Sequence, residues 1–157
     1  MSNSGPASEP VSDLKAHIGF WMRFVSNHVS HAFARKLLKS GVTVAEWVVL
    51  RELYARDHLQ PAKLAELIGM TRGAASKLID RLVEKKLISR TERTDDRRFQ
   101  DISLTAAGTR VVPSLGAMAD RNDHEFFAPL TDAERDTLLA ILKKLVYAHK
   151  LHKLPTR

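Results

Sequence analysis

The feature that most constrains the fold is the segment 61–90, PAKLAELIGMTRGAASKLIDRLVEKKLISR, which predicts two helices joined by a tight turn. Glycine readily adopts the left-handed conformation that ends a helix, and a threonine side chain can cap the next one. Two helices connected in this way form a helix-turn-helix unit. The expected order is Pro61 in a first helical turn, a short helix over Ala62–Ile68, Gly69 as its C-cap, Thr71 as an N-cap, and a longer helix from Arg72 to about Lys86.

The longer helix has one apolar side and one basic side. Small side chains near its N-terminus allow close approach to a groove, while Arg72 and Lys77 can reach base edges or phosphates. The helix N-terminus itself attracts phosphate. Ala75, Leu78, Ile79 and Leu82 form the predicted buried face, and Arg72, Gly73, Ser76, Lys77, Asp80 and Arg81 the outward face. The residues expected to contact DNA on this helix are Thr71, Arg72, Gly73, Ser76, Lys77, Arg81 and Lys85.

A charged hairpin is predicted directly after this helix. Runs over Leu87–Arg93 and Phe99–Leu104 favour two strands, and the second run alternates as a strand does. A two-stranded hairpin is marginal in water by itself, so it must pack on its neighbours. A basic helix followed by such a hairpin predicts a winged helix. Arg97 or Arg98 would enter the minor groove, where arginine is favoured, with Asp95 or Asp96 holding an arginine in place.

Long helical patterns flank this unit. The stretch 13–39 is apolar on several sides, more than a small domain covers, which favours a dimerisation helix. Thr43 with Glu46 and Thr131 with Glu134 have capping-box spacing. The remaining predicted helices are one over 44–56, one from Thr105 to about Phe127 with a kink at Pro113, and a last helix to about His149. The predicted regions are a disordered tail over 1–12, a winged region over 41–104, and a dimerisation region over 13–40 and 105–150. The predicted fold is thus mainly α, a winged helix-turn-helix (three helices and a two-stranded wing) between long N- and C-terminal dimerisation helices.

Composition narrows the class of partner. The 157 residues carry a formal net charge of +7, which favours nucleic acid first and an anionic membrane surface second. No apolar run approaches the roughly 18 residues of a membrane span, and the N-terminus lacks the features of a signal peptide. Cysteine is absent, which excludes disulfides and thiol redox switching. We therefore expect a cytoplasmic protein without a cofactor or a metal.

Three other interpretations compete with DNA binding. The helix pair could be an ordinary amphipathic pair with a solvated basic face, since charge runs usually are. A winged helix could also serve protein–protein contact, with its basic face idle. An enzyme has no positive support, because the chain carries no glycine-rich phosphate loop, no HExxH and no spacing that links its Ser, His and Asp residues.

The stretch LAELIGMTRGAASKLIDRLVEKKLISR, followed by DDRRFQDISLTAAG, resembles the MarR family of bacterial winged-helix regulators. The resemblance extends over about 13–150. It implies a homodimer, joined by its first and last helices, that binds a pseudo-palindromic operator. We expect this regulator to act as a repressor. The resemblance also implies control by a small effector, commonly phenolic or an aromatic acid. Cysteine-based peroxide sensing, known in the family, cannot apply here. The family's wing pattern, Asp-x-Arg, then Leu-Thr, then Gly three residues on, falls on Asp96, Arg98, Leu104, Thr105 and Gly108.

Aromatic and histidine side chains share one side of the first helix. They could line an effector pocket together with the second helix and the helix after the hairpin, since imidazole and indole N–H groups can hold a carboxylate or phenolate. The alternative is dimer packing. His28 and His31 are spaced for one metal ion, but zinc would need further ligands. The candidate pocket residues are His17, Phe20, Trp21, Phe24, His28, Trp47 and Met118.

Overall fold

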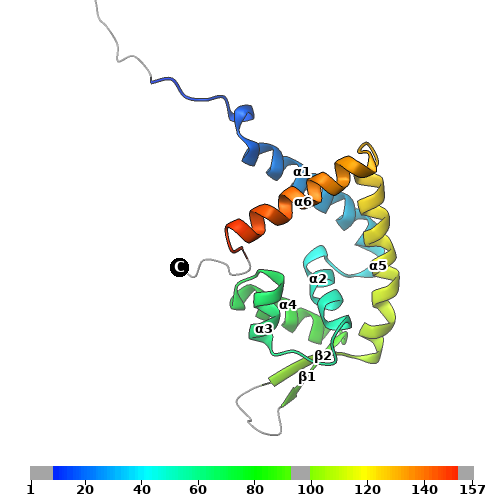
Figure 1. Cartoon of the computed structure of the whole chain (residues 1–157). Coiled ribbons are helices and arrows are strands. Elements are labelled where there is room, and N and C mark those ends of the chain that lie inside the picture. The colour runs from blue at the N-terminus through cyan, green and yellow to red at the C-terminus, as the bar shows by residue number, and fades with distance from the viewer. Residues whose placement is uncertain (1–8, 93–99, 152–157) are drawn as a thin grey trace, which may run out of the picture.

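The computed structural model describes residues 9–92 and 100–151. Helix α5 runs along one side of the molecule (Figure 1). The helices α2, α3 and α4 and the hairpin lie at one end of α5, and α1 and α6 lie at the other. The elements are η1 (Leu14–Ala16), α1 (Ile18–Leu37), η2 (Leu38–Ser40), α2 (Val44–Tyr54), α3 (Pro61–Ile68), α4 (Arg72–Glu84), β1 (Ile88–Glu92), β2 (Gln100–Leu104), α5 (Ala106–Phe126) and α6 (Asp132–Ala148).

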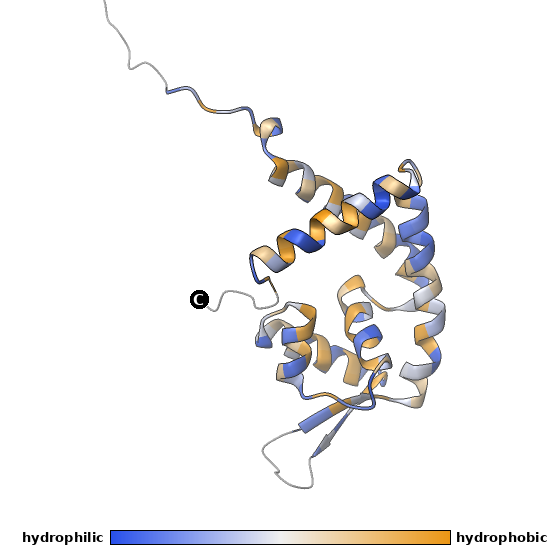
Figure 2. Ribbon diagram, viewed as in Figure 1, coloured by the Kyte–Doolittle hydropathy of each residue, from blue (hydrophilic) through white to orange (hydrophobic). Residues whose placement is uncertain are grey.

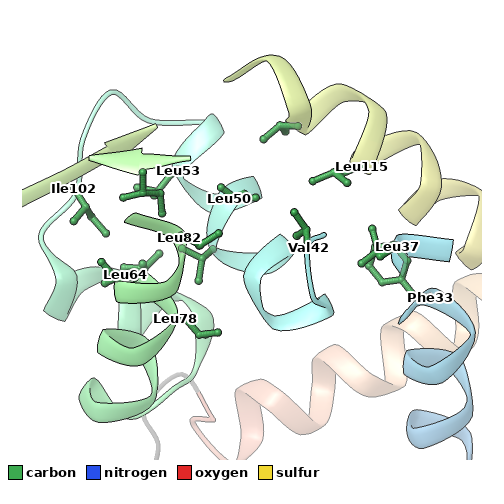
Figure 3. Close-up of a cluster of buried hydrophobic side chains, with 14 residues drawn as sticks. Phe33, Leu37, Val42, Leu50, Leu53, Leu64, Leu78, Leu82, Ile102 and Leu115 are labelled. Carbon is green, nitrogen blue, oxygen red and sulfur yellow. The ribbon is translucent and has the colours of Figure 1, made fainter. Parts of the chain in front are cut away.

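One apolar core holds the winged region together (Figure 3). Leu50 and Leu53 of α2 are fully buried, as are Leu64 of α3 and Leu82 of α4. Ile102 of β2 completes this part of the core, so the hairpin packs on the helices as expected. Burial of such side chains supplies the main driving force, about 1.5–3 kcal/mol for each one. The core continues toward α1 and α5 through Phe33, Leu37, Val112 and Leu115.

Four threonines cap four helices at their N-termini, as their positions predict. Thr43, Thr71, Thr105 and Thr131 each accept a hydrogen bond from the backbone N–H three residues on. At α2 the Glu46 carboxylate also accepts from the Thr43 N–H, which completes the predicted capping box. Each such cap contributes about 1 kcal/mol to helix stability. The local rules therefore place most helix starts correctly.

The hairpin is antiparallel, with Ile88 opposite Leu104 and Glu92 opposite Gln100. A further pairing was not expected from the sequence. Leu59, in the connector before α3, forms a bridge to Ile102, with both backbone hydrogen bonds present at 2.9 and 2.8 Å. The connector thus adds one strand-like residue to the outer side of β2.

Three helix boundaries differ from prediction. The first helical stretch is broken at His17, which has extended backbone (φ −90°, ψ 126°) between η1 and α1. Helix α4 ends at Glu84, and Lys86 then adopts a left-handed φ of +62°. Helix α2 ends at Tyr54 rather than near Arg56. Helix α5 is a single element that continues through Pro113.

Helices α1 and α6 expose several large apolar side chains. The apolar residues of both helices are orange in Figure 2. A polar cluster joins α1 to α5: the Lys36 ammonium donates to Asn122 Oδ1 and lies 2.9 Å from Glu125 Oε2. The Asn122 amide donates in turn to the Val29 carbonyl. Helix α6 has no buried residue. None of the helices in the described ranges is long and apolar enough to cross a membrane.

Candidate nucleic-acid interface

Helix α4 presents the basic face that its sequence predicts. The four apolar residues predicted to face the core, Ala75, Leu78, Ile79 and Leu82, are all buried. Every predicted outward-facing residue of the helix is exposed. The exposed set is Arg72, Gly73, Ser76, Lys77, Asp80 and Arg81.

The N-terminal end of α4 suits an anion. The Thr71 side-chain oxygen accepts a hydrogen bond from the Ala74 N–H, and no acidic residue occupies the first turn of the helix. The partial positive charge of this helix end is therefore not cancelled locally. A Cβ built on Gly73 meets no atom within 4 Å, so this turn is open and free of obstruction.

An ion pair joins α4 to the wing. Arg90 of β1 donates to the Asp80 carboxylate on the outward face of α4. Asp80 also lines a shallow depression with Lys77 and Arg81. Asp80 thus has a cationic partner from the neighbouring strand, and with Arg72, Lys77 and Arg81 beside it the predicted outward face of α4 is net positive.

The side chain of Lys85 makes contacts within the protein that the sequence did not predict. Its ammonium donates to Glu46 Oε2 at 2.7 Å and to the Gly41 carbonyl at 2.6 Å. Glu46 is a buried acid, with an exposed fraction of 1%. These contacts favour a structural role over the phosphate contact predicted for Lys85. The spacing of Thr43 and Glu46 marked Glu46 as a cap, but nothing local in the sequence pairs it with Lys85.

The tip of the wing lies outside the described residues, and with it Asp96, Arg97 and Arg98. The base of the hairpin is described. Arg90, Thr91 and Glu92 of β1 are exposed, and Gln100 opposite them is exposed as well. The strands therefore extend away from the core toward the predicted tip.

The seven candidate effector residues fall into two groups. Trp47 and Met118 pack at the edge of the core, where Trp47 meets Phe33 edge-on at 6.4 Å between ring centroids. The others lie along η1 and α1: His17, Trp21, Phe24 and His28 are exposed and Phe20 is partly buried.

The polar groups of this stripe already have local partners. The Trp21 indole N–H donates to the Lys15 carbonyl at 2.9 Å. The His28 Nδ1 lies 2.7 Å from the Phe24 carbonyl, and its ring stacks on the Phe24 ring. These contacts favour the packing interpretation of the stripe over a pocket formed within one chain. An open hollow occurs elsewhere, at the α5–α6 corner, lined in part by Phe127, Arg135 and Leu139. In the part of the chain that the structure describes, no three His, Asp or Glu side chains gather as a metal site.

Comparisons with known proteins identify the fold. The family model described as "MarR family" matches residues 40–98. A Thauera aromatica protein named "Putative transcriptional regulatory protein for hcr operon" is 30% identical over 145 residues, which is 92% of this chain and 87% of that one. The transcriptional repressor MdtR of Bacillus subtilis is 41% identical over 98 residues, 62% of this chain and 63% of its own.

A solved structure extends the likeness to three dimensions. A cysteine-to-serine mutant of MarR from E. coli, complexed with operator DNA, superposes with a TM-score of 0.79 at 25% identity. The match covers 86% of this chain and 99% of that one. The helix-turn-helix, the wing and both flanking helices therefore recur together. The chain belongs to the MarR family of winged helix-turn-helix transcriptional regulators, which are operator-binding proteins and not enzymes.

Proposed function

We propose that the protein is a repressor that binds a pseudo-palindromic operator as a homodimer, with one α4 helix in each half-site. The outward face of α4 carries this proposal, because the basic and small residues predicted to face outward are all exposed, while the four apolar residues predicted to face the core are all buried. In a two-fold dimer the two helices would enter successive major grooves about 34 Å apart.

The exposed apolar surface supports a dimer. On α6, Leu139 and Ile141 are each about half exposed, and on α1 Trp21 and Phe24 are as well. Large exposed apolar patches on a protein surface usually mark an interaction site. A second copy of the chain, contributing the same two helices by two-fold symmetry, would cover both faces at once.

The proposal gives different roles to different positions. Arg72, Ser76 and Lys77 read base edges, with Thr71 and Gly73 allowing close approach, and the Lys77 charge also neutralises a neighbouring phosphate. Arg81, whose side chain is 54% exposed, contacts phosphate. Asp96, Arg97 and Arg98 serve the wing, in line with the sequence prediction.

Selection of bound sequences from random duplex DNA tests the proposal. An enriched palindrome is expected, and Arg72→Ala should relax the preference at one base of each half-site, at a cost of about 1–3 kcal/mol. Arg121→Ala, an exposed arginine near the far end of α5, is the matched control and should change nothing. Operator affinity should fall roughly a thousandfold or more between 50 and 200 mM salt. Failure to enrich any palindrome would favour a protein-binding winged helix.

The proposal extends to control by a small aromatic or phenolic acid. The aromatic stripe of α1 is open in the single chain, so a pocket there would be completed only by the partner of a dimer. An effector shifts the dimer only if it binds the free form more tightly than the DNA-bound form. A screen of aromatic acids for release of labelled operator tests this part separately, and Phe24→Ala should weaken any release observed.

A further inference from the structure

Glu46 is the most deeply buried charged side chain that the structure describes. One of its oxygens, Oε2, accepts from the Thr43 N–H at 3.2 Å and from the Lys85 ammonium at 2.7 Å. The other, Oε1, lies 3.8 Å from the Arg81 Nε. A buried carboxylate needs such partners, because an unpaired charge in the interior is strongly destabilising.

The contacts of Glu46 connect two separate parts of the fold. Lys85 follows the last residue of α4, and its ammonium also donates to the Gly41 carbonyl. Gly41 has a left-handed φ of +72° and lies between η2 and α2, where the chain leaves the long α1 helix. The end of α4 is therefore attached to the turn through which α1 joins the winged region.

The geometry points to Glu46 and Lys85 as positioning residues for operator binding. They fix the C-terminal end of α4 on the α1–α2 turn and so set the orientation of its outward face, without contacting DNA themselves. The inference rests on the proposed role of α4 as the DNA-reading helix. It gives Lys85 a role that a surface lysine of the same helix, such as Lys77, does not have.

The salt dependence of DNA affinity distinguishes a lysine that positions α4 from a lysine that contacts phosphate. A lysine that neutralises a phosphate contributes about 1 to the slope of log affinity against log salt, and its removal lowers that slope. A positioning lysine leaves the slope unchanged and lowers affinity for the operator more than for random DNA. Lys85→Met keeps the aliphatic stem and removes the charge, and Lys77→Met is the matched control on the exposed face.

The experiment measures the affinity of the full-length protein for its selected operator and for random duplex DNA at several salt concentrations. Lys85→Met should weaken operator binding roughly two- to thirtyfold, the range of coupling through packed polar networks, with an unchanged slope. Lys77→Met should lower the slope by about 1. Glu46→Gln, which retains an acceptor for the Thr43 N–H, should resemble Lys85→Met. The Glu46→Gln/Lys85→Met double variant should bind the operator no more weakly than the weaker-binding single variant, because both substitutions break the same contact.

Thermal unfolding of each variant shows whether it is folded. Lys85→Arg retains a cation for Glu46 and should restore most of the operator affinity, which a general loss of stability in Lys85→Met could not explain. A slope that falls in Lys85→Met as it does in Lys77→Met would overturn the inference, as would Glu46→Gln with wild-type affinity. Absence of any operator preference in the wild-type protein would instead refute the proposed function.

Discussion

Replacement of Gly108 by alanine should destabilise the fold at one defined contact. Gly108 lies in the first turn of α5, and a Cβ built there would be 2.1 Å from the backbone oxygen of Leu87. Real Cβ atoms essentially never come within 3.0 Å of another heavy atom of this kind, so the backbone must shift by about 0.9 Å. The Leu87 oxygen cannot move freely, because it accepts a hydrogen bond from the Thr105 N–H at 3.0 Å.

The expected loss follows from two opposing contributions. Overpacking a filled site costs about 1–3 kcal/mol, and a backbone obstacle favours the upper part of that range. Alanine gains up to about 1 kcal/mol over glycine in helix propensity, which offsets part of the loss. A net destabilisation of about 2 kcal/mol should lower the unfolding midpoint by roughly 4–8 °C for a chain of this size. Calorimetry or circular dichroism at one fixed protein concentration measures this shift, since the proposed dimer would make the midpoint concentration-dependent.

Gly116→Ala in the same helix is the matched control. Its Cβ would lie 3.5 Å from Cη2 of Trp47, an ordinary van der Waals contact. This variant should gain rather than lose stability, by up to about 1 kcal/mol. Equal midpoints for the two variants, or a more stable Gly108→Ala, would refute the steric argument.

Two further predictions concern charge. Asp80→Asn releases Arg90 and removes a negative charge from the outward face of α4. Affinity for random DNA should therefore rise by up to about fivefold at low salt, the equivalent of about 1 kcal/mol, and the gain should fade as salt rises. Gel-shift titrations measure this affinity, and a loss of affinity would contradict the prediction. The Lys36 ammonium hydrogen-bonds to Glu125 and lowers the pKa of that carboxyl below its ordinary value of 4.5, so this contact stabilises the fold above that pH and is lost as the pH falls. Glu125→Gln should therefore reduce the drop in unfolding midpoint on acidification, and an unchanged drop would show that the contact is immaterial.

The sequence predicts local structure well because the deciding interactions are local. The caps at Thr43, Thr71, Thr105 and Thr131 act within three residues, and the apolar spacing of α4 fixes which side is buried. The Gly69 turn, with φ of +68°, follows from glycine's access to that conformation. The exposed basic face of α4 could therefore be assigned residue by residue. The predicted wing-tip residues and the effector residues remain predictions.

The features that the sequence did not predict join positions far apart in the chain. Glu46 and Lys85 are 39 residues apart, and neither side chain signals its partner. Leu59 lies in a connector whose composition indicates only a loop, yet it pairs with Ile102 through two backbone hydrogen bonds. Tertiary contacts, which no short window contains, decide both. The break at His17 is a different case, because the hydrogen bonds beside it are local: Asp13 accepts from the Lys15 N–H, and the Trp21 indole donates to the Lys15 carbonyl.

The Leu59–Ile102 bridge has a mechanical consequence for the encounter with DNA. Because the connector leads directly into α3 while Ile102 belongs to β2, the bridge attaches the helix-turn-helix to the hairpin on the side of β2 that faces away from β1. If α4 enters a major groove and the wing enters the neighbouring minor groove, as proposed, the bridge would limit changes in the spacing between the two contacts. A DNA site whose groove spacing differs from that of the protein would then have to bend or twist to fit. Operators would therefore differ in affinity according to the stiffness of the duplex as well as its base sequence.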